Sequence, residues 1–274
     1  MTINCKGQLI DISKPKVMGV LNVTPDSFYD GGSYKDESDI LNQVATMLTE
    51  GATFIDVGGY SSRPGADFVS EEEELERVIP VIELILKEFP KTYISIDTFR
   101  SKVAKQTIET GAALINDISA GKLDEKMIET IGKFGVPYIM MHMRGNPKTM
   151  QSQTDYKDLV IDIVSYFGER IAQAHKAKIN DIIIDPGFGF AKTLKQNFEL
   201  LNRMELLKIT DKPILAGISR KSMIYKTLNM SASEALNGTT ALNMMALENG
   251  ASILRVHDVK EAMECVTLFN QLKS

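Results

Sequence analysis

Eight short apolar runs alternate with longer amphipathic segments along the chain, and this alternation limits the possible folds more than any other feature. The runs cover residues 17–21, 53–57, 93–97, 113–117, 137–141, 181–185, 213–217 and 252–256. Nearly continuous apolar runs of this length are typical of parallel strands that are buried on both faces. Eight strand–helix units within about 250 residues predict an α/β fold, the (β/α)₈ TIM barrel.

The segments between the runs have the apolar spacing of helices. They cover residues 38–50, 71–88, 101–109, 124–133, 155–177, 195–207, 233–249 and 258–272. Ser70 with Glu73 matches the capping-box pattern at the start of the second segment. Ser231 with Glu234 matches it before the seventh segment. Pro80 lies inside the second segment, where we expect it to kink the helix.

The competing arrangement is a doubly wound open sheet, which shows the same alternation of strands and helices. The count of eight, and the lack of a GxGxxG motif after the first run, favour the barrel. Residues 3–5 and 8–12 indicate a short N-terminal β-hairpin that turns at Lys6-Gly7. No linker rich in Pro, Gly or Ser interrupts the chain, so we expect one domain over residues 1–274.

Composition excludes several classes of function. The formal net charge is -5, which does not suggest a nucleic-acid-binding surface. No apolar run reaches the length of a transmembrane helix, and the N-terminus lacks the apolar core of a signal peptide. Cys5 and Cys265 stand at opposite ends of the chain and suit neither a metal site nor a disulfide framework. We expect a soluble cytoplasmic protein that binds neither nucleic acid nor membrane.

Polar residues follow nearly every predicted strand. They are Asn22, Ser61–Gly65, Asp97, Asn116-Asp117, His142, Asp185, Ser219–Ser222, Arg255 and His257. Each by itself is typical of a helix cap, a turn or a structural histidine. In a barrel, however, the carboxyl ends of all eight strands converge on one pocket. The long polar loop over residues 22–32 is open to two interpretations, a surface loop with Asx turns or a binding loop.

The charges at these strand ends divide into two kinds. Carboxylates and an amide from Asp97, Asn116 and Asp185 are acceptors that suit the N–H edge of an aminopyrimidine ring. The second kind is basic and suits phosphate oxygens. These residues are Arg63, Arg220, Lys221, Arg255 and His257. Asn22 and the carboxylates of the loop after it could bind Mg²⁺, which prefers oxygen ligands. These residues predict a pocket for a polar heterocycle with a phosphorylated group nearer its mouth.

At these residues the chain resembles the dihydropteroate synthase family, the pterin-binding barrels of folate biosynthesis. The matching stretches are MGVLNVTPDSFYDGG (18–32), DVGGYSSRPGA (56–66), SIDTFRSKVA (95–104), INDISA (115–120), MHMRGNPKTMQ (141–151), DPGFGFAK (185–192), GISRKSMI (217–224) and RVHDV (255–259). The resemblance implies a transferase that joins 6-hydroxymethyl-7,8-dihydropterin diphosphate to 4-aminobenzoate. The products would be 7,8-dihydropteroate and pyrophosphate.

The resemblance also implies a role for each matching residue. The residues that hold the pterin would be Asp97, Asn116, Asp185 and Lys221, with Met140, Phe190 and Gly217 around the ring. The residues that meet the diphosphate would be Arg255, His257 and Asn22, and Asn22 would also bind Mg²⁺. Ser62 stands where the family usually has Thr, and it keeps the hydroxyl for a diphosphate contact. The residues near 4-aminobenzoate, which sulfonamides mimic, would be Phe28, Arg63, Pro64 and Ser222.

We further hypothesise a dissociative, SN1-like displacement in which Asp97 opposes the cation left on the pterin and Asp185 anchors the ring. Asp97, Asp185, Lys221 and Asn22 are therefore the expected catalytic residues. The family suggests a homodimer formed through the last two helices. Two alternatives share the barrel: a methyltetrahydrofolate methyltransferase, whose reaction has no diphosphate to bind, and a non-catalytic pterin-binding paralogue. The Ser219–Lys221 and Arg255–His257 clusters speak against the first.

Overall fold

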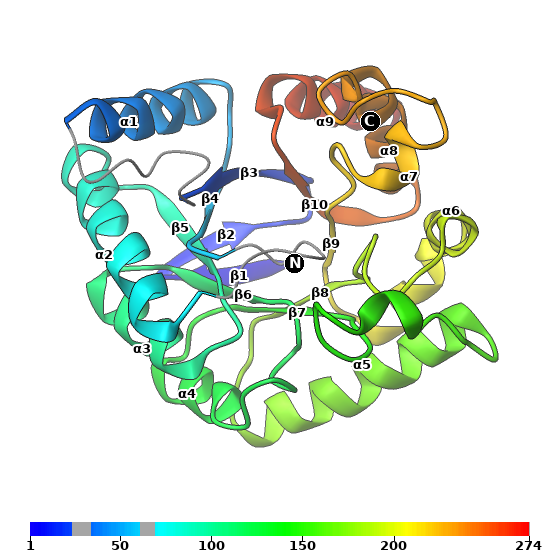
Figure 1. Cartoon of the computed structure of the whole chain (residues 1–274), viewed down its shortest axis with the longest axis horizontal. Helices are drawn as coiled ribbons and strands as arrows, with labels where there is room; N and C mark the ends of the chain where they lie inside the picture. Colours follow the sequence, from blue (N-terminus) through cyan, green and yellow to red (C-terminus); the bar gives the residue numbers. More distant parts are fainter. Residues whose placement is uncertain (24–33, 61–68, 274) are drawn as a thin grey trace.

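A computed structural model of the chain describes residues 1–23, 34–60 and 69–273. The predicted barrel is confirmed, because eight parallel strands close in the order β10-β3-β4-β5-β6-β7-β8-β9. They are β3 (Lys16–Asn22), β4 (Phe54–Gly58), β5 (Tyr93–Asp97), β6 (Leu114–Asp117), β7 (Tyr138–Met141), β8 (Ile182–Asp185), β9 (Ile214–Ala216) and β10 (Ala251–Val256). Figure 1 shows these strands as a central ring with the helices around it.

Helices follow the strands as the apolar spacing predicts. They are α1 (Tyr34–Thr49), α2 (Glu71–Glu88), α3 (Ser101–Thr110), α4 (Met127–Phe134), α5 (Leu159–Lys176), α6 (Leu194–Asn202), α7 (Ser222–Tyr225), α8 (Leu236–Glu248) and α9 (Val259–Lys273). Short 3₁₀ helices occupy Met150–Ser152 (η1) and Met204–Thr210 (η2). None of the helices among the described residues is long and apolar enough to cross a membrane.

Capping residues explain where several helices begin. The side chain of Ser70 accepts a hydrogen bond from the Glu73 N–H, so the predicted cap of α2 is confirmed, and α2 continues through Pro80. The second predicted capping box is wrong about the helix start. Ser231 and Glu234 do contact each other, but they form a turn, and α8 begins later at Leu236. Likewise α5 begins at Leu159, because Asp158 caps the Val160 and Ile161 N–H groups.

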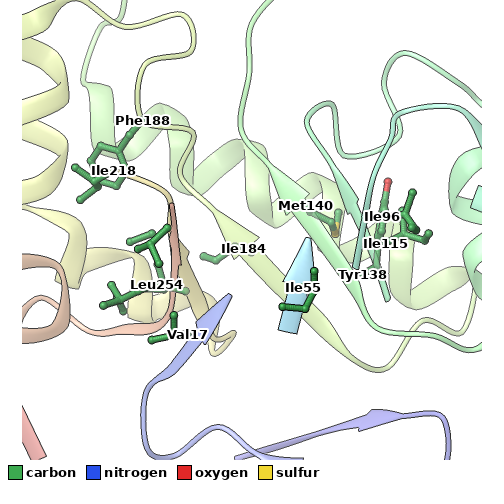
Figure 2. Packing of buried hydrophobic residues seen from close by; sticks show 14 of the residues in the cluster. Val17, Ile55, Ile96, Ile115, Tyr138, Met140, Ile184, Phe188, Ile218 and Leu254 are labelled. Carbon is green, nitrogen blue, oxygen red and sulfur yellow. The ribbon is translucent and has the colours of Figure 1, made fainter. Parts of the chain in front are cut away.

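The strands alternate their side chains between two apolar layers. The outward-facing residues pack against the helices, and Figure 2 shows part of this layer with Val17, Ile55, Ile96, Ile115, Tyr138, Met140, Ile184 and Leu254. The inward-facing residues of the lower barrel form a second layer with Met18, Phe54, Leu114, Ile139, Ile183, Leu215 and Ile253. Apolar side chains fill the lower interior, so the polar side chains that point inward lie toward the upper, carboxyl end of the strands.

The predicted N-terminal hairpin closes the lower end of the barrel. β1 (Thr2–Cys5) pairs antiparallel with β2 (Gln8–Asp11), and Lys6-Gly7 form the turn with positive φ angles at both residues, as a type I′ hairpin turn requires. Ile3, Cys5 and Ile12 belong to the same apolar cluster as the inward-facing strand residues. Burial raises the pKa of the Cys5 thiol to about 12, which makes this free cysteine unreactive.

Candidate active site

Polar side chains from adjacent strands lie side by side at the carboxyl end of the barrel. In the strand register Asn22 pairs with Gly58, Gly58 pairs with Asp97, and Asp97 pairs with Asn116. On the other side of the ring, Asp185 pairs with Met141. Register partners in a parallel sheet point to the same face. The structure therefore brings these strand-end residues together at one end of the barrel, as the sequence predicts.

Asp97 is a carboxylate in an unfavourable position for its charge. Its pKa is raised to about 7, mainly by burial. The charge of Arg255 opposes this rise, and the charges of Asp56 and Glu74 add to it. The Tyr60 hydroxyl lies 3.4 Å from Asp97 Oδ1 and donates to it. Nearby carboxylates and low solvation make Asp97 a group that gains when a positive charge arrives next to it.

Asn116 presents a bare acceptor inside the barrel. The side chain is fully buried, and its Nδ2 donates to Asp56 Oδ2 over 3.0 Å. Its Oδ1 has no hydrogen-bond partner. A buried carbonyl oxygen without a donor costs about 1–3 kcal/mol. The cost is recovered when a ligand brings an N–H group to that oxygen.

Asp185 and Lys221 form the opposite side of the site. Asp185 is buried, and its Oδ1 accepts the Gly187 N–H over 2.7 Å. The Lys221 ammonium donates to the Phe188 carbonyl and lies 5.0 Å from the centre of the Phe190 ring. Burial lowers the pKa of Lys221 to about 8, although the charge of Asp185 opposes this. Phe190 belongs to an apolar cluster that also contains Met141 and Tyr60.

Arg255 places a cation between the carboxylates. Its Nε lies 3.5 Å from Asp56 Oδ2, and its side chain is mostly buried. Gly217 leaves room beside it, because a Cβ at that position would lie 3.9 Å from the Cβ of Arg255 and 4.0 Å from Asp185 Oδ2. A larger side chain at Gly217 would therefore occupy space between these two charged groups.

His257 is exposed just beyond the end of β10, and Ser219 fixes its ring. The Ser219 Oγ lies 3.1 Å from His257 Nδ1 and accepts the His257 backbone N–H. Asn22 ends β3 with its Oδ1 over Gly58, where a Cβ would lie 3.9 Å from that oxygen. Ser222 is the first residue of α7, directly after Lys221.

A buried lysine holds the loop after β8 in place. Lys192 Nζ donates to the carbonyls of Gly187 and Phe190 over 3.0 Å each, and it lies 3.1 Å from His142 Nδ1. Burial lowers the pKa of Lys192 to about 7 and that of His142 well below its usual range. Gly187 passes so close to His142 that a Cβ would lie 2.1 Å from the His142 carbonyl oxygen. His142 is therefore structural, and this loop positions Phe188 and Phe190 next to Lys221.

Two predictions about site residues are wrong. Met140 faces away from the pocket, because it pairs with the outward-facing Ile184 and packs in the outer layer (Figure 2). The next residue, Met141, is the one in the cluster with Phe190. Arg220 does not face a phosphate site either. Its guanidinium makes a two-pronged pair with Asp258, with bonds of 2.8 and 2.6 Å.

Four predicted site residues, Phe28, Ser62, Arg63 and Pro64, lie outside the described residues, as does most of the loop over 22–32. Sequence reasoning also missed several residues that shape the site: Asp56, Tyr60, Ser95, Met141 and Lys192. One signal could have revealed Asp56 and Ser95. Each is a polar residue within an apolar run, two positions before an inward-facing strand end, and so it must share the inward face.

Comparison with known proteins identifies the class. A model of the family described as pterin binding enzyme matches residues 18–257, and the chain belongs to this family. A dihydropteroate synthase of Escherichia coli (strain K12) is 46% identical over 97% of this chain and 94% of its own length. Within the pterin-binding family the chain thus belongs with the dihydropteroate synthases, which are transferases of folate synthesis.

Solved structures agree with this assignment. A Yersinia pestis dihydropteroate synthase in complex with a sulfonamide drug has a TM-score of 0.93 and 42% identity, covering 100% of this chain and 99% of that one. A Xanthomonas albilineans dihydropteroate synthase with 4-aminobenzoic acid has a TM-score of 0.92 and 35% identity, covering 100% and 98%. The barrel and the N-terminal hairpin therefore follow a known enzyme fold.

Proposed function

We propose that this enzyme condenses 6-hydroxymethyl-7,8-dihydropterin diphosphate with 4-aminobenzoate to form 7,8-dihydropteroate and pyrophosphate. The observation that carries the proposal is the division of charge at the barrel end. Acceptors on the half-buried Asp97 and the buried Asn116 and Asp185 lie at the carboxyl end of the barrel, and Lys221 and Arg255 add positive charge. A nitrogen-rich ring that carries a diphosphate matches both halves.

The pterin ring would be held by its N–H donors and its carbonyl oxygen. Asn116 Oδ1 and the Asp185 carboxylate accept N–H groups, and the Lys221 ammonium donates to an oxygen or ring nitrogen. Phe190 and Met141 cover the ring with apolar surface. Buried hydrogen-bonding groups that go unpaired are costly, so this set discriminates strongly against rings without the matching donors.

The diphosphate would lie against Arg255, His257 and Asn22. Arginine offers several N–H donors to phosphate oxygens, and Ser219 holds the His257 ring in one orientation. Among the described residues no group of three His, Cys, Asp or Glu side chains could enclose a metal ion. Mg²⁺ is often bound by few protein ligands, with substrate phosphates and waters as the others, and the amide oxygen of Asn22 suits this kind of site. When bound, Mg²⁺ would supply positive charge to the leaving diphosphate.

The reaction would proceed by departure of the diphosphate before the amine attacks. Arg255 and His257 stabilise the charge that develops on the leaving group, and the electron-rich dihydropterin spreads the positive charge left on carbon. Asp97 stands ready to oppose that cation, because it is a carboxylate whose ionised form is poorly solvated. Groups arranged before the reaction for a charge that appears only in the transition state are the strongest source of catalysis.

The amine of 4-aminobenzoate would then attack the cation on carbon, and a proton would leave the nitrogen. The substrate is supported by the Xanthomonas relative solved with 4-aminobenzoic acid. A sulfonamide mimics this amine and carboxylate pair, and the Yersinia relative binds such a drug. We therefore propose that sulfonamides compete with 4-aminobenzoate in this enzyme. Of the residues proposed to lie near 4-aminobenzoate, Ser222 at the start of α7 is the one within the described part of the chain.

The test of the function is a product assay with purified protein. Incubation with the pterin diphosphate, 4-aminobenzoate and Mg²⁺ is expected to give dihydropteroate and pyrophosphate in equal amounts. Liquid chromatography measures the first, and a phosphate assay coupled to pyrophosphatase measures the second as two phosphates. Lys221→Ala should abolish both products. Transfer of a methyl group from methyltetrahydrofolate, or pterin binding without any product, would contradict the proposal.

We also propose a homodimer formed through α8 and α9, which lie next to each other in the outer ring of helices (Figure 1). These helices expose Met245, Leu268 and Leu272 by 45%, 61% and 68%. Leu268 and Leu272 stand one helical turn apart and share a face. Light scattering should give a dimer mass for the wild type and a monomer mass for Leu268→Glu/Leu272→Glu. Ile161→Glu, which changes an equally exposed residue on α5, is the matched control.

A further inference from the structure

Asp56 is a buried carboxylate that no part of the mechanism above uses directly. It lies in the middle of β4, and its side chain is 2% exposed. Its register partner on β5 is Ser95, which shares its inward direction. A buried charge in a barrel interior is costly unless it is paired and hydrogen-bonded, so its contacts explain why it is there.

Three donors from three different strands meet at this carboxylate. Ser95 Oγ, on β5, donates to Asp56 Oδ1 over 2.6 Å. Asn116 Nδ2, on β6, donates to Oδ2 over 3.0 Å, and Arg255 Nε, on β10, lies 3.5 Å from the same oxygen. Asp56 thereby connects one residue proposed for the ring and one proposed for the diphosphate.

The chemistry of a carboxylate decides which way the Asn116 amide points. A carboxylate that already receives the Ser95 hydroxyl and faces the Arg255 guanidinium accepts hydrogen bonds and donates none. The amide must therefore turn its NH₂ group toward Asp56. Its oxygen is then left in the buried interior without a partner, as observed. If the amide were reversed, two oxygens would face each other and an NH₂ group would point into the pocket.

We propose that Asp56 is the positioning residue that makes Asn116 a hydrogen-bond acceptor for the substrate ring and holds Arg255 next to it. Asp56 does not touch the substrate and acts through these two side chains. The ring specificity of the pocket would then depend on a residue beneath it. This inference rests on the pterin pocket proposed above and assigns its orientation to a specific cause.

Exchanging the two residues tests this directly. In Asp56→Asn the amide at 116 can adopt either orientation and Arg255 loses its charged partner. In Asn116→Asp two carboxylates oppose each other. In the double variant the new amide at 56 donates to the new carboxylate at 116, whose other oxygen again offers an acceptor to the pocket.

We expect each single variant to raise the KM for the pterin diphosphate by roughly ten- to a hundredfold, since an unpaired buried group costs about that factor. The KM for 4-aminobenzoate should change by less than about threefold, because Asp56 acts only on the ring and diphosphate side. The double variant should recover most of the loss. Asp11→Asn, an exposed change in the hairpin, is the matched control and should behave as the wild type.

Titration calorimetry with 6-hydroxymethylpterin separates this inference from the proposed function, because it measures ring binding without turnover. If the wild type binds this pterin and forms no product, the function proposal fails while the Asp56 test proceeds on affinity alone. The inference is overturned if Asp56→Asn binds the pterin as the wild type does, or if the double variant binds no better than the weaker single variant. Thermal unfolding accompanies each measurement. If Asp56→Asn does not fold, the comparison of Asn116→Asp with the double variant decides the question.

Discussion

Replacing Asp97 by Asn is expected to make the fold more stable while removing most of the turnover. Asp97 ends β5 among other carboxylates, and its ionised form is poorly solvated. The amide has nearly the same shape but no charge to solvate. The variant should therefore separate the structural cost of this carboxylate from its benefit to catalysis.

The size of the stability effect follows from the pKa of Asp97. Its rise from 3.8 to about 7 corresponds to at most about 4 kcal/mol of folding free energy, and water at the pocket mouth reduces this. The folded protein binds this proton more tightly than the unfolded chain does. The wild type therefore loses stability as the pH rises from about 4 to about 7, and the penalty stays constant above that range.

The assays are urea unfolding at acidic and alkaline pH, and steady-state kinetics. The variant's advantage in the free energy of unfolding should be small near pH 4.5 and about 2–4 kcal/mol near pH 8. Turnover should fall by roughly a hundred- to a thousandfold, the typical loss for one electrostatic group, with a much smaller change in pterin affinity. A variant that is less stable than the wild type at pH 8, or that loses affinity and turnover equally, would refute this reasoning.

Four further outcomes follow from the site. A plot of kcat/KM against pH should rise near pH 7, as Asp97 ionises, and fall near pH 8, as Lys221 loses its proton; a flat profile between pH 6 and 9 would contradict both assignments. Gly217→Val should raise the KM for the pterin diphosphate more than Gly217→Ala does, because only the larger side chain fills the space beside Arg255. Lys192→Met should lower the free energy of unfolding by about 2–4 kcal/mol, because two carbonyls and a histidine lose their donor, whereas the exposed Lys195→Met should not. Arg220→Ala should cost about 1–2 kcal/mol of stability and leave the KM for the pterin diphosphate unchanged, since its guanidinium is paired with Asp258.

The fold was predictable from the sequence because its signal is repeated. Each strand is a short apolar run, each following helix has its own spacing, and eight repeats leave little choice of architecture. Helix boundaries were less predictable where two signals compete. The Ser231–Glu234 contact forms as expected, but it closes a turn and not the first turn of the helix, because such a pair suits both. The helix α8 begins only at Leu236, five residues after Ser231.

Site residues could be predicted where they stand at the end of a strand. They could not be predicted where their role depends on which face a side chain points to, or on a partner distant in the sequence. Met140 and Met141 are neighbours on β7 and point to opposite faces of the sheet. Met140 therefore packs in the outer core, while Met141 lies on the pocket side. Arg220 is adjacent to Lys221 in sequence, yet it pairs with a residue 38 positions away, a contact that no local pattern reveals. Its φ of +55°, unusual for a residue with a side chain, belongs to the turn between β9 and α7.

Asp56 shows a different limit. It sits inside an apolar run, where a single carboxylate looks like an interruption of a strand rather than part of a site. Its importance depends on Ser95, Asn116 and Arg255, which come from three other strands. Such a group is visible only once the barrel has closed.

The proposed mechanism requires that the diphosphate leaves before the amine attacks, with the separated charges at the barrel end stabilising both fragments. It is tested most directly by placing a heavy-oxygen label in the bridge between the pterin methylene carbon and the diphosphate. Incubation with wild-type enzyme and Mg²⁺, without 4-aminobenzoate, should move the label into non-bridging positions, because the bond breaks and reforms. Asp97→Asn should show far less exchange. A label that stays in the bridge during incubation with an enzyme that turns over normally once the amine is added would contradict the claim.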